Sequence, residues 1–319
     1  STDFPTKAWG AAYFNNTLTG GFSDEDVFII RFSSTGTLDW ATYYGGFGWD
    51  EGYSITTDAA GNIYITGWTN GSNFPTQPWG SAYFNSFFGG GFADAFILRF
   101  SSAGILDWAT FYGGSDTDYG HSITTDVTGN IYVTGMTVST DFLTQPWGTA
   151  YFDNTLVGTW GVYEDAFILR FSATGALSWA TFYGASLVDI GISITTDATG
   201  NIYVLGMTDS YDFHTQSWGT AYFDGIFGGT FFDVFILRFS PTGNLDWATY
   251  YGGSENEGGL SSIPLYDNMV IDNCGNIYIS FETESANIQT LDAGCGSYYD
   301  GTYGGSSGAL AGDVFLVKF

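Results

Sequence analysis

The stretch DAFILRFSSAGILDWATFYGG, residues 94–114, decides the fold of this chain. Its first seven residues are rich in the aromatic and branched side chains that favour strands, and a second run of the same kind follows at 105–112. The turn Ser-Ser-Ala-Gly lies between the two runs, and a pair of glycines ends the second. This order predicts a β-hairpin.

The turn also predicts how the two strands of this hairpin are aligned. If Gly104 takes the left-handed conformation of a three-residue loop, Phe100 lies opposite Leu106. Arg99 then falls directly opposite Asp107. We interpret this charged pair as structural, because a partly enclosed ion pair specifies geometry more reliably than it adds stability.

A second hairpin is predicted directly after the first. Ser-Ile-Thr-Thr-Asp at 122–126 and Ile-Tyr-Val-Thr-Gly at 131–135 flank a tight turn, in which Asp126 is expected to bond the turn backbone. Two hairpins give a four-stranded unit. Since helical periodicity of useful length is absent from the sequence, we expect an all-β protein.

This unit recurs along the chain with a period of roughly 70 residues. The marker Gly-Asn-Ile-Tyr begins at Gly61, Gly129, Gly200 and Gly275, and the marker Asp-x-Phe begins at Asp26, Asp94, Asp165, Asp233 and Asp313. The expected units are approximately 1–70, 71–138, 139–209 and 210–285, with a partial unit at 286–319. Because both faces of the strands are apolar or small, we predict a β-propeller-like array of about four four-stranded antiparallel blades.

Several recurring motifs resemble the bacterial SBBP (β-propeller) repeat. They are Gly-Asn-Ile-Tyr-Val-Thr-Gly-x-Thr, Asp-Phe-Pro-Thr, Asp-Ala-Phe-Ile-Leu-Arg-Phe and Thr-x-Tyr-Gly-Gly. The resemblance spans nearly the whole chain and implies a propeller fold. It also implies a secreted or cell-surface bacterial protein without enzymatic activity, and it transfers no catalytic residue.

The charge balance disfavours two classes of partner. With 33 acidic and six basic residues, the formal net charge is −27. Such a field repels phosphate backbones, so neither nucleic acid nor an anionic membrane is expected to bind. The sequence lacks a run of 18 apolar residues, and we expect no membrane insertion.

The excess of aspartate has two interpretations. Aspartate is favoured in tight turns, where its carboxylate bonds nearby backbone amides. Oxygen-rich loops also suit Ca²⁺, the only cofactor that we consider, although the sequence contains no Asp-x-Asp-x-Asp-Gly loop. The candidate ligands lie after the Tyr-Gly-Gly motifs and their equivalents: Asp50, Asp116, Asp118 and Asp189.

Tryptophan recurs at two positions of the unit. One series lies in a strand, at Trp40, Trp108, Trp179 and Trp247, and the other lies in the long loop, at Trp9, Trp79, Trp147 and Trp218. Core packing explains repetition at both positions. The loop series is the better candidate for stacking on surface glycans, because the blade itself does not need that loop.

Both cysteines lie in the aberrant last unit. Cys274 precedes a Gly-Asn turn, and Cys295 replaces the tryptophan of the long loop. We predict a disulfide between them that substitutes for packing. Such a bond indicates an oxidising compartment, which fits an extracellular or cell-surface location.

The last strand-like segment is surplus to four complete units. If residues 1–46 complete the last unit, Asp313-Val-Phe-Leu-Val-Lys-Phe319 is left without a place inside the chain. An unpaired apolar strand adds readily to the sheet of another chain. We therefore expect the chain to associate with copies of itself through this strand, in a filament or a larger array.

These observations favour a non-catalytic, structural or adhesive protein. The alternative is a glycan-binding, lectin-like propeller. An enzyme is disfavoured because His121 and His214 do not recur between units and stand beside no serine or cysteine motif.

Overall fold

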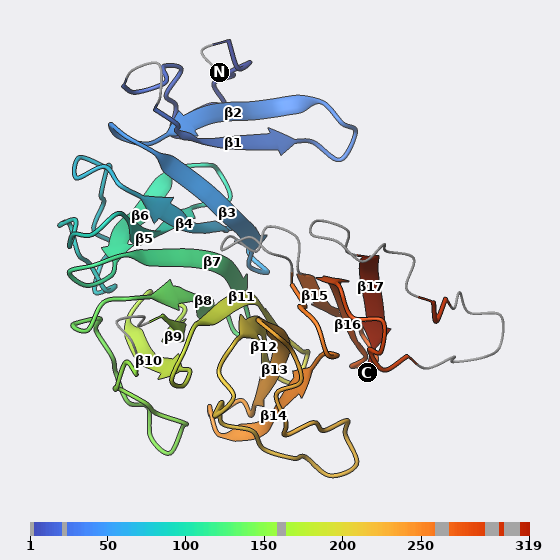
Figure 1. Ribbon diagram of the computed structural model, residues 1–319. Helices are drawn as coiled ribbons and strands as arrows, with labels where there is room; N and C mark the ends of the chain where they lie inside the picture. Colours follow the sequence, from blue (N-terminus) through green and yellow to red (C-terminus); the bar gives the residue numbers. More distant parts are fainter. Residues whose placement is uncertain (1–2, 21–23, 158–163, 259–267, 291–299, 303–312) are drawn as a thin grey trace. The chain divides into compact units, whose positions relative to one another are not determined.

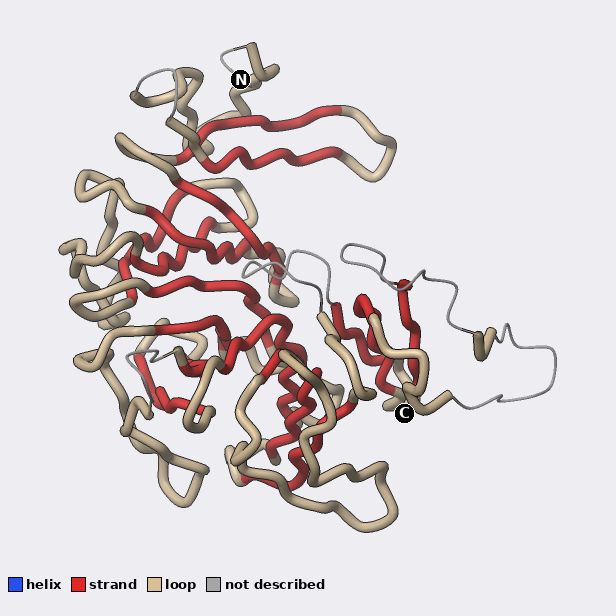
Figure 2. Tube along the Cα trace, in the orientation of Figure 1, coloured by secondary structure: helices blue, strands red, loops and turns tan. Residues whose placement is uncertain are grey.

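The computed structural model describes residues 3–20, 24–157, 164–258, 268–290, 300–302 and 313–319. The regular structure in these residues consists of β-strands, as predicted (Figures 1 and 2). No helix in the described ranges is long and apolar enough to cross a membrane.

Three four-stranded sheets form the centre of the sequence. Neighbouring strands in them are antiparallel. The first sheet contains β3 (Asp50–Thr57), β4 (Ile63–Thr69), β5 (Asp94–Phe100) and β6 (Leu106–Tyr112). The second contains β7 (Asp118–Thr125), β8 (Ile131–Thr137), β9 (Asp165–Phe171) and β10 (Leu177–Tyr183). The third contains β11 (Asp189–Thr196), β12 (Ile202–Thr208), β13 (Asp233–Phe239) and β14 (Leu245–Tyr251).

The sheets at the two ends of the chain have fewer strands. β1 (Val27–Phe32) and β2 (Leu38–Tyr44) form a two-stranded sheet that corresponds to the last two strands of a complete one. β15 (Asn268–Ile271), β16 (Ile277–Thr283) and β17 (Asp313–Lys318) form a three-stranded sheet that corresponds to the first three. The prediction of propeller-like antiparallel sheets is confirmed, and each end sheet is incomplete in the described residues.

The last strand has a partner within its own chain, which corrects one expectation. β17 pairs with β16 along its length, from Tyr278 opposite Lys318 to Thr283 opposite Asp313. The expectation that this segment finds no place in the chain was wrong, because the Asp-x-Phe strand follows the Gly-Asn-Ile-Tyr strand in every sheet that contains both. Its outer edge, where a fourth strand would pair, has no strand among the described residues.

The predicted alignment of the hairpin is right at one position and wrong at the next. Phe100 lies opposite Leu106 as expected, but Arg99 lies opposite Trp108. A β-bulge between the two pairs leaves Asp107 as the extra residue. Gly104 has the predicted left-handed conformation, with a φ of 75°.

Each Asp-x-Phe strand has two apolar faces, and in β5 a neighbouring sheet covers each of them. We call the side with Phe96, Leu98 and Phe100 the Phe face of β5, and the side with Ala95 and Ile97 its aliphatic face. The Phe face of β5 shares a core with Val27 and Ile29 of β1. Its aliphatic face shares another core with the Phe face of β9, formed by Phe167, Leu169 and Phe171.

The same rule holds near the end of the chain. Val234 and Ile236 of β13 share a core with Phe315, Val317 and Phe319, the Phe face of β17. Within each compact unit, the aliphatic face of one Asp-x-Phe strand therefore packs against the Phe face of the next. Close packing on both faces explains why the central strands read as continuous apolar runs.

The chain divides into two compact units. The first contains the sheet of β1 and β2, the sheet of β3 to β6 and most of the sheet of β7 to β10. The second contains the sheet of β11 to β14 and the sheet of β15 to β17. The sheets are offset from the predicted repeat units, because each central sheet takes its first two strands from one unit and its last two from the following unit.

The long loop before each Asp-x-Phe strand makes contacts with the following sheet. We call its Trp-Gly-x-Ala-Tyr segment the latch, which occurs at 9–13, 79–83, 147–151 and 218–222. The Tyr13 amide donates a hydrogen bond to the Gly104 carbonyl at 2.8 Å, in the hairpin turn of the next sheet, and Tyr83 makes the same bond to Gly175 at 2.9 Å. The latch carbonyl of Tyr83 also accepts the indole N–H of the buried Trp108 at 2.8 Å.

We predict that the two tryptophan series differ in their contribution to stability. Trp108→Ala should lower the free energy of unfolding by about 3–5 kcal/mol, because it empties a fully buried site. Trp218→Ala should cost much less, because its side chain is 43% exposed. Denaturant titrations followed by intrinsic fluorescence measure both values, and equal losses would contradict this description of the core.

Candidate functional site

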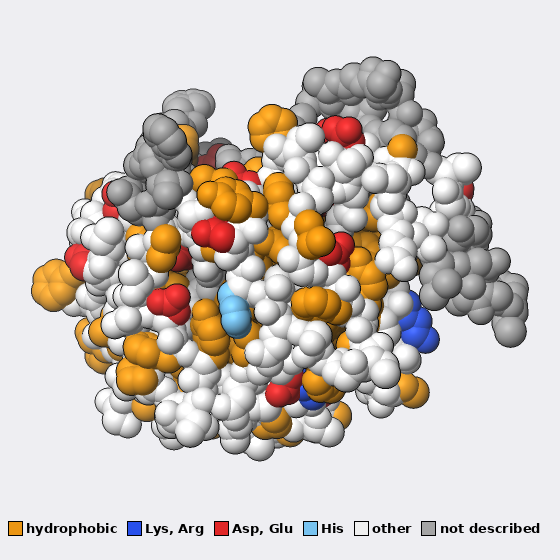
Figure 3. All heavy atoms as spheres, turned by 60° about the horizontal axis from the view of Figure 1, so that its bottom comes forward, with side chains coloured by type: hydrophobic (Ala, Val, Ile, Leu, Met, Phe, Trp, Pro, Cys, Tyr) orange, Lys and Arg blue, Asp and Glu red, His pale blue; other side chains and the backbone are white. Residues whose placement is uncertain are grey.

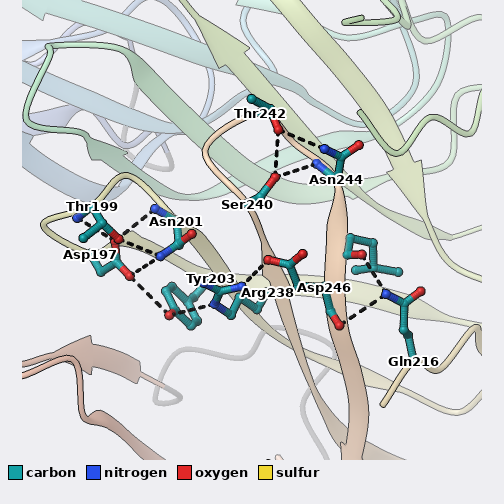
Figure 4. A network of polar contacts seen from close by, with 11 residues as sticks. Asp197, Thr199, Asn201, Tyr203, Gln216, Arg238, Ser240, Thr242, Asn244 and Asp246 are labelled. Atoms are coloured by element: carbon teal, nitrogen blue, oxygen red, sulfur yellow. Dashed lines mark hydrogen bonds and ion pairs between the residues drawn. The ribbon is translucent and has the colours of Figure 1, made fainter. Parts of the chain in front are cut away.

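A polar network runs through the sheet of β11 to β14 (Figure 4). Arg238 on β13 donates from Nε to the hydroxyl of Tyr203 on β12 at 3.1 Å, and its Nη1 forms an ion pair with Asp246 on β14. The Tyr203 hydroxyl in turn donates to Asp197 Oδ2 at 3.3 Å. One arginine thus connects three strands and a turn.

The turn at the end of this network is held by a single carboxylate. Asp197 accepts hydrogen bonds from the amides of Thr199 at 2.8 Å and Asn201 at 3.0 Å. Burial pushes its pKa up, but the hydrogen bonds from Asn201 and Thr199 outweigh burial and hold the pKa below its usual range. The carboxylate therefore stays charged, as the predicted role of the equivalent Asp126 requires.

The other complete sheets repeat the network. Arg99 bonds Tyr64 and pairs with Asp107. Arg170 bonds Tyr132 at 3.2 Å, with Ser178 in place of the aspartate. The predicted structural role of the basic residue is thus supported by its contacts with both adjacent strands.

The two end sheets each contain only part of the network. Arg31 lies 3.8 Å from Asp39, and its sheet has no Gly-Asn-Ile-Tyr strand to supply a tyrosine. In the last sheet Lys318 takes the arginine position, with its Nζ 5.5 Å from the centre of the Tyr278 ring.

The loop tryptophans stack on the same arginines. The guanidinium carbon lies 3.9–4.2 Å from the indole centre in all four pairs: Arg31 over Trp9, Arg99 over Trp79, Arg170 over Trp147 and Arg238 over Trp218. Such cation–π stacking gives these indoles a packing role. Glycan binding by Trp9, Trp79, Trp147 and Trp218 stays a prediction, and the arginine already occupies one face of each ring.

Three of the four calcium candidates occupy one repeated, buried position. Asp50, Asp118 and Asp189 are the first residues of β3, β7 and β11, and they are at most 1% exposed. Asp116 lies apart on an exposed loop, where it accepts the Thr117 amide at 2.9 Å.

The oxygens of Asp118 already have hydrogen-bond donors. They accept bonds from the Gly114 amide at 2.8 Å, the Ser139 hydroxyl at 2.9 Å and the Thr137 hydroxyl. Within the described residues, no group of three or more His, Cys, Asp or Glu side chains could hold a metal ion. Calcium binding stays a prediction, and the observed contacts are those of the alternative interpretation, in which aspartate bonds the backbone of a turn.

A second buried carboxyl, that of Asp94, lies beside Asp118, and in the sequence it stands out only as a marker of the repeat. Asp94 begins β5 and is fully buried, and its Oδ2 accepts the Gly89 amide at 2.6 Å. Asp94 and Asp118 meet at Gly113, where a Cβ would lie 2.5 Å from Asp118 Oδ2 and 3.2 Å from Asp94 Cγ. This close approach explains the first glycine of the Tyr-Gly-Gly motif.

Burial makes these carboxyl groups weaker acids than an exposed aspartate. It raises the pKa of Asp94 to about 7, and it raises the pKa of Asp118 and Asp189 to about 7 as well. Asp94 Oδ1 is buried and accepts no hydrogen bond from the described residues. A neutral carboxyl therefore suits the Asp94 site better than a charged one.

Only one of the two cysteines in the predicted disulfide lies in the described part of the chain. Cys274 is exposed and its amide donates to Asp272 Oδ1 at 2.9 Å, which places it in the turn before Gly275 as expected. Cys295 lies outside the described residues, so the disulfide stays a prediction. The two histidines make aromatic contacts, since His121 stacks on Tyr53 at 5.7 Å and His214 on Tyr151 at 6.4 Å.

The strands and networks define an all-β repeat protein with propeller-like sheets, and a family comparison identifies the repeat. The β-propeller repeat called SBBP matches residues 39–75, 107–142 and 178–214. Each match begins in the last strand of one sheet and ends in the loop after the second strand of the next. The chain therefore contains three copies of the SBBP β-propeller repeat.

A comparison with curated proteins found a distant relative from Acanthamoeba polyphaga mimivirus. It is described as an uncharacterized WD repeat-containing protein, L264, and is 22% identical over 240 residues. The alignment covers 70% of this chain and 17% of the relative, so the chain spans less than a fifth of the relative's length.

We predict that mild acid stabilises this protein. Because the folded-state pKa of Asp94 exceeds the unfolded value of about 3.9, the folded state binds more protons between these values. The stabilisation is therefore complete at low pH and is lost as the pH rises through about 7. The melting temperature should be higher at about pH 5 than at about pH 8.

A matched pair of variants isolates the buried group. Asp94→Asn should reduce the pH dependence of the melting temperature, whereas Asp116→Asn removes a carboxyl group from an exposed loop and should leave that dependence unchanged. An unaltered pH dependence in Asp94→Asn would contradict the assignment of a raised pKa to this residue.

We also predict that the arginine networks differ in strength between complete and incomplete sheets. Arg99→Met should lower the free energy of unfolding by about 1.5–3 kcal/mol, because it removes charged hydrogen bonds from a side chain that is only 11% exposed. Arg31→Met should have a small effect, because Arg31 has no tyrosine beside it in its own sheet. Chemical denaturation compares the two, and equal losses would refute the difference.

Proposed function

We propose that this protein is a non-catalytic structural or adhesive β-propeller repeat protein that assembles with copies of itself at the bacterial cell surface or outside the cell. The observation that carries the proposal is the exposed apolar side of the sheet of β15 to β17. β17 is an edge strand, and two of its side chains, Val314 and Leu316, are more exposed than any other large hydrophobic side chain in its sheet.

The side chains of the described residues support a structural role. The polar groups that recur in each unit bond one another or the backbone: the arginine, its tyrosine and the turn aspartate form a network within the sheet. Groups engaged in this way hold strands together and are not positioned to act on a substrate. The repeat family supports the same reading.

Charge and surface composition support an extracellular location. The net charge of −27 disfavours nucleic acids, and Cys274 is compatible with the predicted disulfide in an oxidising compartment. Hydrophobic side chains also reach the surface of the protein, as one of its faces shows (Figure 3). Exposed apolar surface of this kind marks sites of protein association.

The proposed assembly is tested by substituting the exposed side of β17. The wild-type chain should form particles larger than its 34.5 kDa monomer, and their size should increase with protein concentration. Val314→Lys combined with Leu316→Lys should reduce them to monomers, because assembly would bury two charged side chains. Size-exclusion chromatography with light scattering measures both results.

Val270→Lys serves as the matched control. Val270 is 60% exposed on β15 of the same sheet, and its substitution adds one lysine away from β17. This control should assemble like the wild type. The proposal fails if the wild-type chain is monomeric at every concentration, or if the double variant assembles normally.

A further inference from the structure

We propose that the surface that receives β17 is the Phe face of β1 on a second copy of this chain, formed by Phe28, Ile30 and Phe32. This inference rests on the proposed function, since it names the partner surface in the same assembly. The contact would place the aliphatic face of the last sheet of one copy against the first sheet of the next.

The packing inside the chain supplies the pattern for this contact. Val27 and Ile29 of β1 pack against Phe96, Leu98 and Phe100 of β5. Val314 and Leu316 of β17 occupy the repeat positions of Val27 and Ile29, counted from the Asp-x-Phe marker. The packing of β5 on β9 and of β13 on β17 follows the same rule.

Within its own compact unit, the Phe face of β1 has no neighbouring sheet among the described residues. Phe28 is 60% exposed and Phe32 is 59% exposed, whereas the equivalent Phe96 and Phe100 of β5 are fully buried. A short contact with Phe4, at 5.1 Å between ring centres, covers only part of Phe28. These large apolar side chains occupy positions that are buried in the complete sheets.

The hairpin turn of β1 and β2 lacks a neighbour in the same way. In the next sheet, a Cβ on Gly104 would lie 2.7 Å from the Cβ of Ala12, in the latch of the preceding sheet. Gly36 holds the equivalent position, and no atom of the described residues lies within 4 Å of its Cβ position. Among the described residues, the hairpin of β1 and β2 therefore has no latch packed against its turn.

The opposite end of the chain presents the matching surface. Val314 is 85% exposed and Leu316 is 71% exposed, whereas the equivalent Val27 and Ile29 are buried. Lys318 lies on the same face, two positions after Leu316. Its counterpart Arg31 donates to the Ser102 carbonyl of the next sheet at 3.4 Å.

The position of Lys318 therefore adds a polar contact to the apolar one. By the same correspondence, Lys318 would reach the carbonyl of Ser34 in the hairpin turn of the second copy. Because the two surfaces lie on different ends of the chain, the contact is heterologous and leaves one free surface of each kind. Association of this type continues into a ring or a filament.

Two variants that each block one end test this arrangement. The tail variant carries Val314→Lys and Leu316→Lys, and the head variant carries Ile30→Lys and Phe32→Lys. Each should be monomeric alone. The head variant keeps β17 intact, and the tail variant keeps the Phe face of β1 intact. These two surfaces fit each other, so an equimolar mixture should form a dimer that grows no further.

Light scattering after chromatography gives the mass of each sample, and thermal melts establish that both variants fold. Ile55→Lys adds a charge at a 59% exposed site on β3 and should assemble like the wild type. If the head variant assembles normally, the partner surface is elsewhere and this inference is wrong, while the proposed function stands. A mixture that stays monomeric would also overturn it.

If the wild-type chain is itself monomeric, both proposals fail together. The wild-type chain could instead assemble, with the tail variant as the one variant that fails to do so. This result would indicate that the β17 surfaces of two copies contact each other. That result would contradict the head-to-tail arrangement and would leave the proposed self-association intact.

Discussion

The structure depends on one constraint: every Asp-x-Phe strand has two apolar faces, and another sheet must cover each of them. The described residues contain no helix that could do so, which leaves neighbouring sheets as the cover. Val27 and Ile29 against the Phe face of β5 are one example. The latch that crosses from one sheet to the hairpin of the next and the buried indole of Trp108 both serve this packing. In each end sheet, the described residues cover only one of the two apolar faces of the Asp-x-Phe strand.

Polar groups are arranged around the same packing. A chain with six basic residues places five of them at one position of the repeat, where each can connect neighbouring strands. The acidic residues are divided between two environments. Asp197 is bonded by amides in an open turn and keeps a low pKa, whereas Asp94 is enclosed and has a high one. Burial, and not residue type, decides which aspartates carry charge near neutral pH.

Local features of the fold could be predicted from the sequence, because turns and strand-forming runs are set by nearby residues. The hairpin of 94–112 and the repeat are examples. The bulge at Asp107 was missed, since the turn rule pairs residues one for one and a bulge adds an unpaired residue to one strand. The pairing of β17 with β16 was missed because the segments are far apart in the chain. The buried state of Asp94 was missed for a similar reason, since three-dimensional packing creates it and the sequence shows only a recurring aspartate.

Coverage of both faces of every sheet is the central claim, and it extends to the ends of the chain. Negative-stain electron microscopy of the purified protein tests it most directly, because each particle shows whether its end sheets are covered by a neighbour. The account predicts rings or filaments in which one subunit follows another head to tail. A field of isolated single subunits at concentrations where the protein is folded would contradict it.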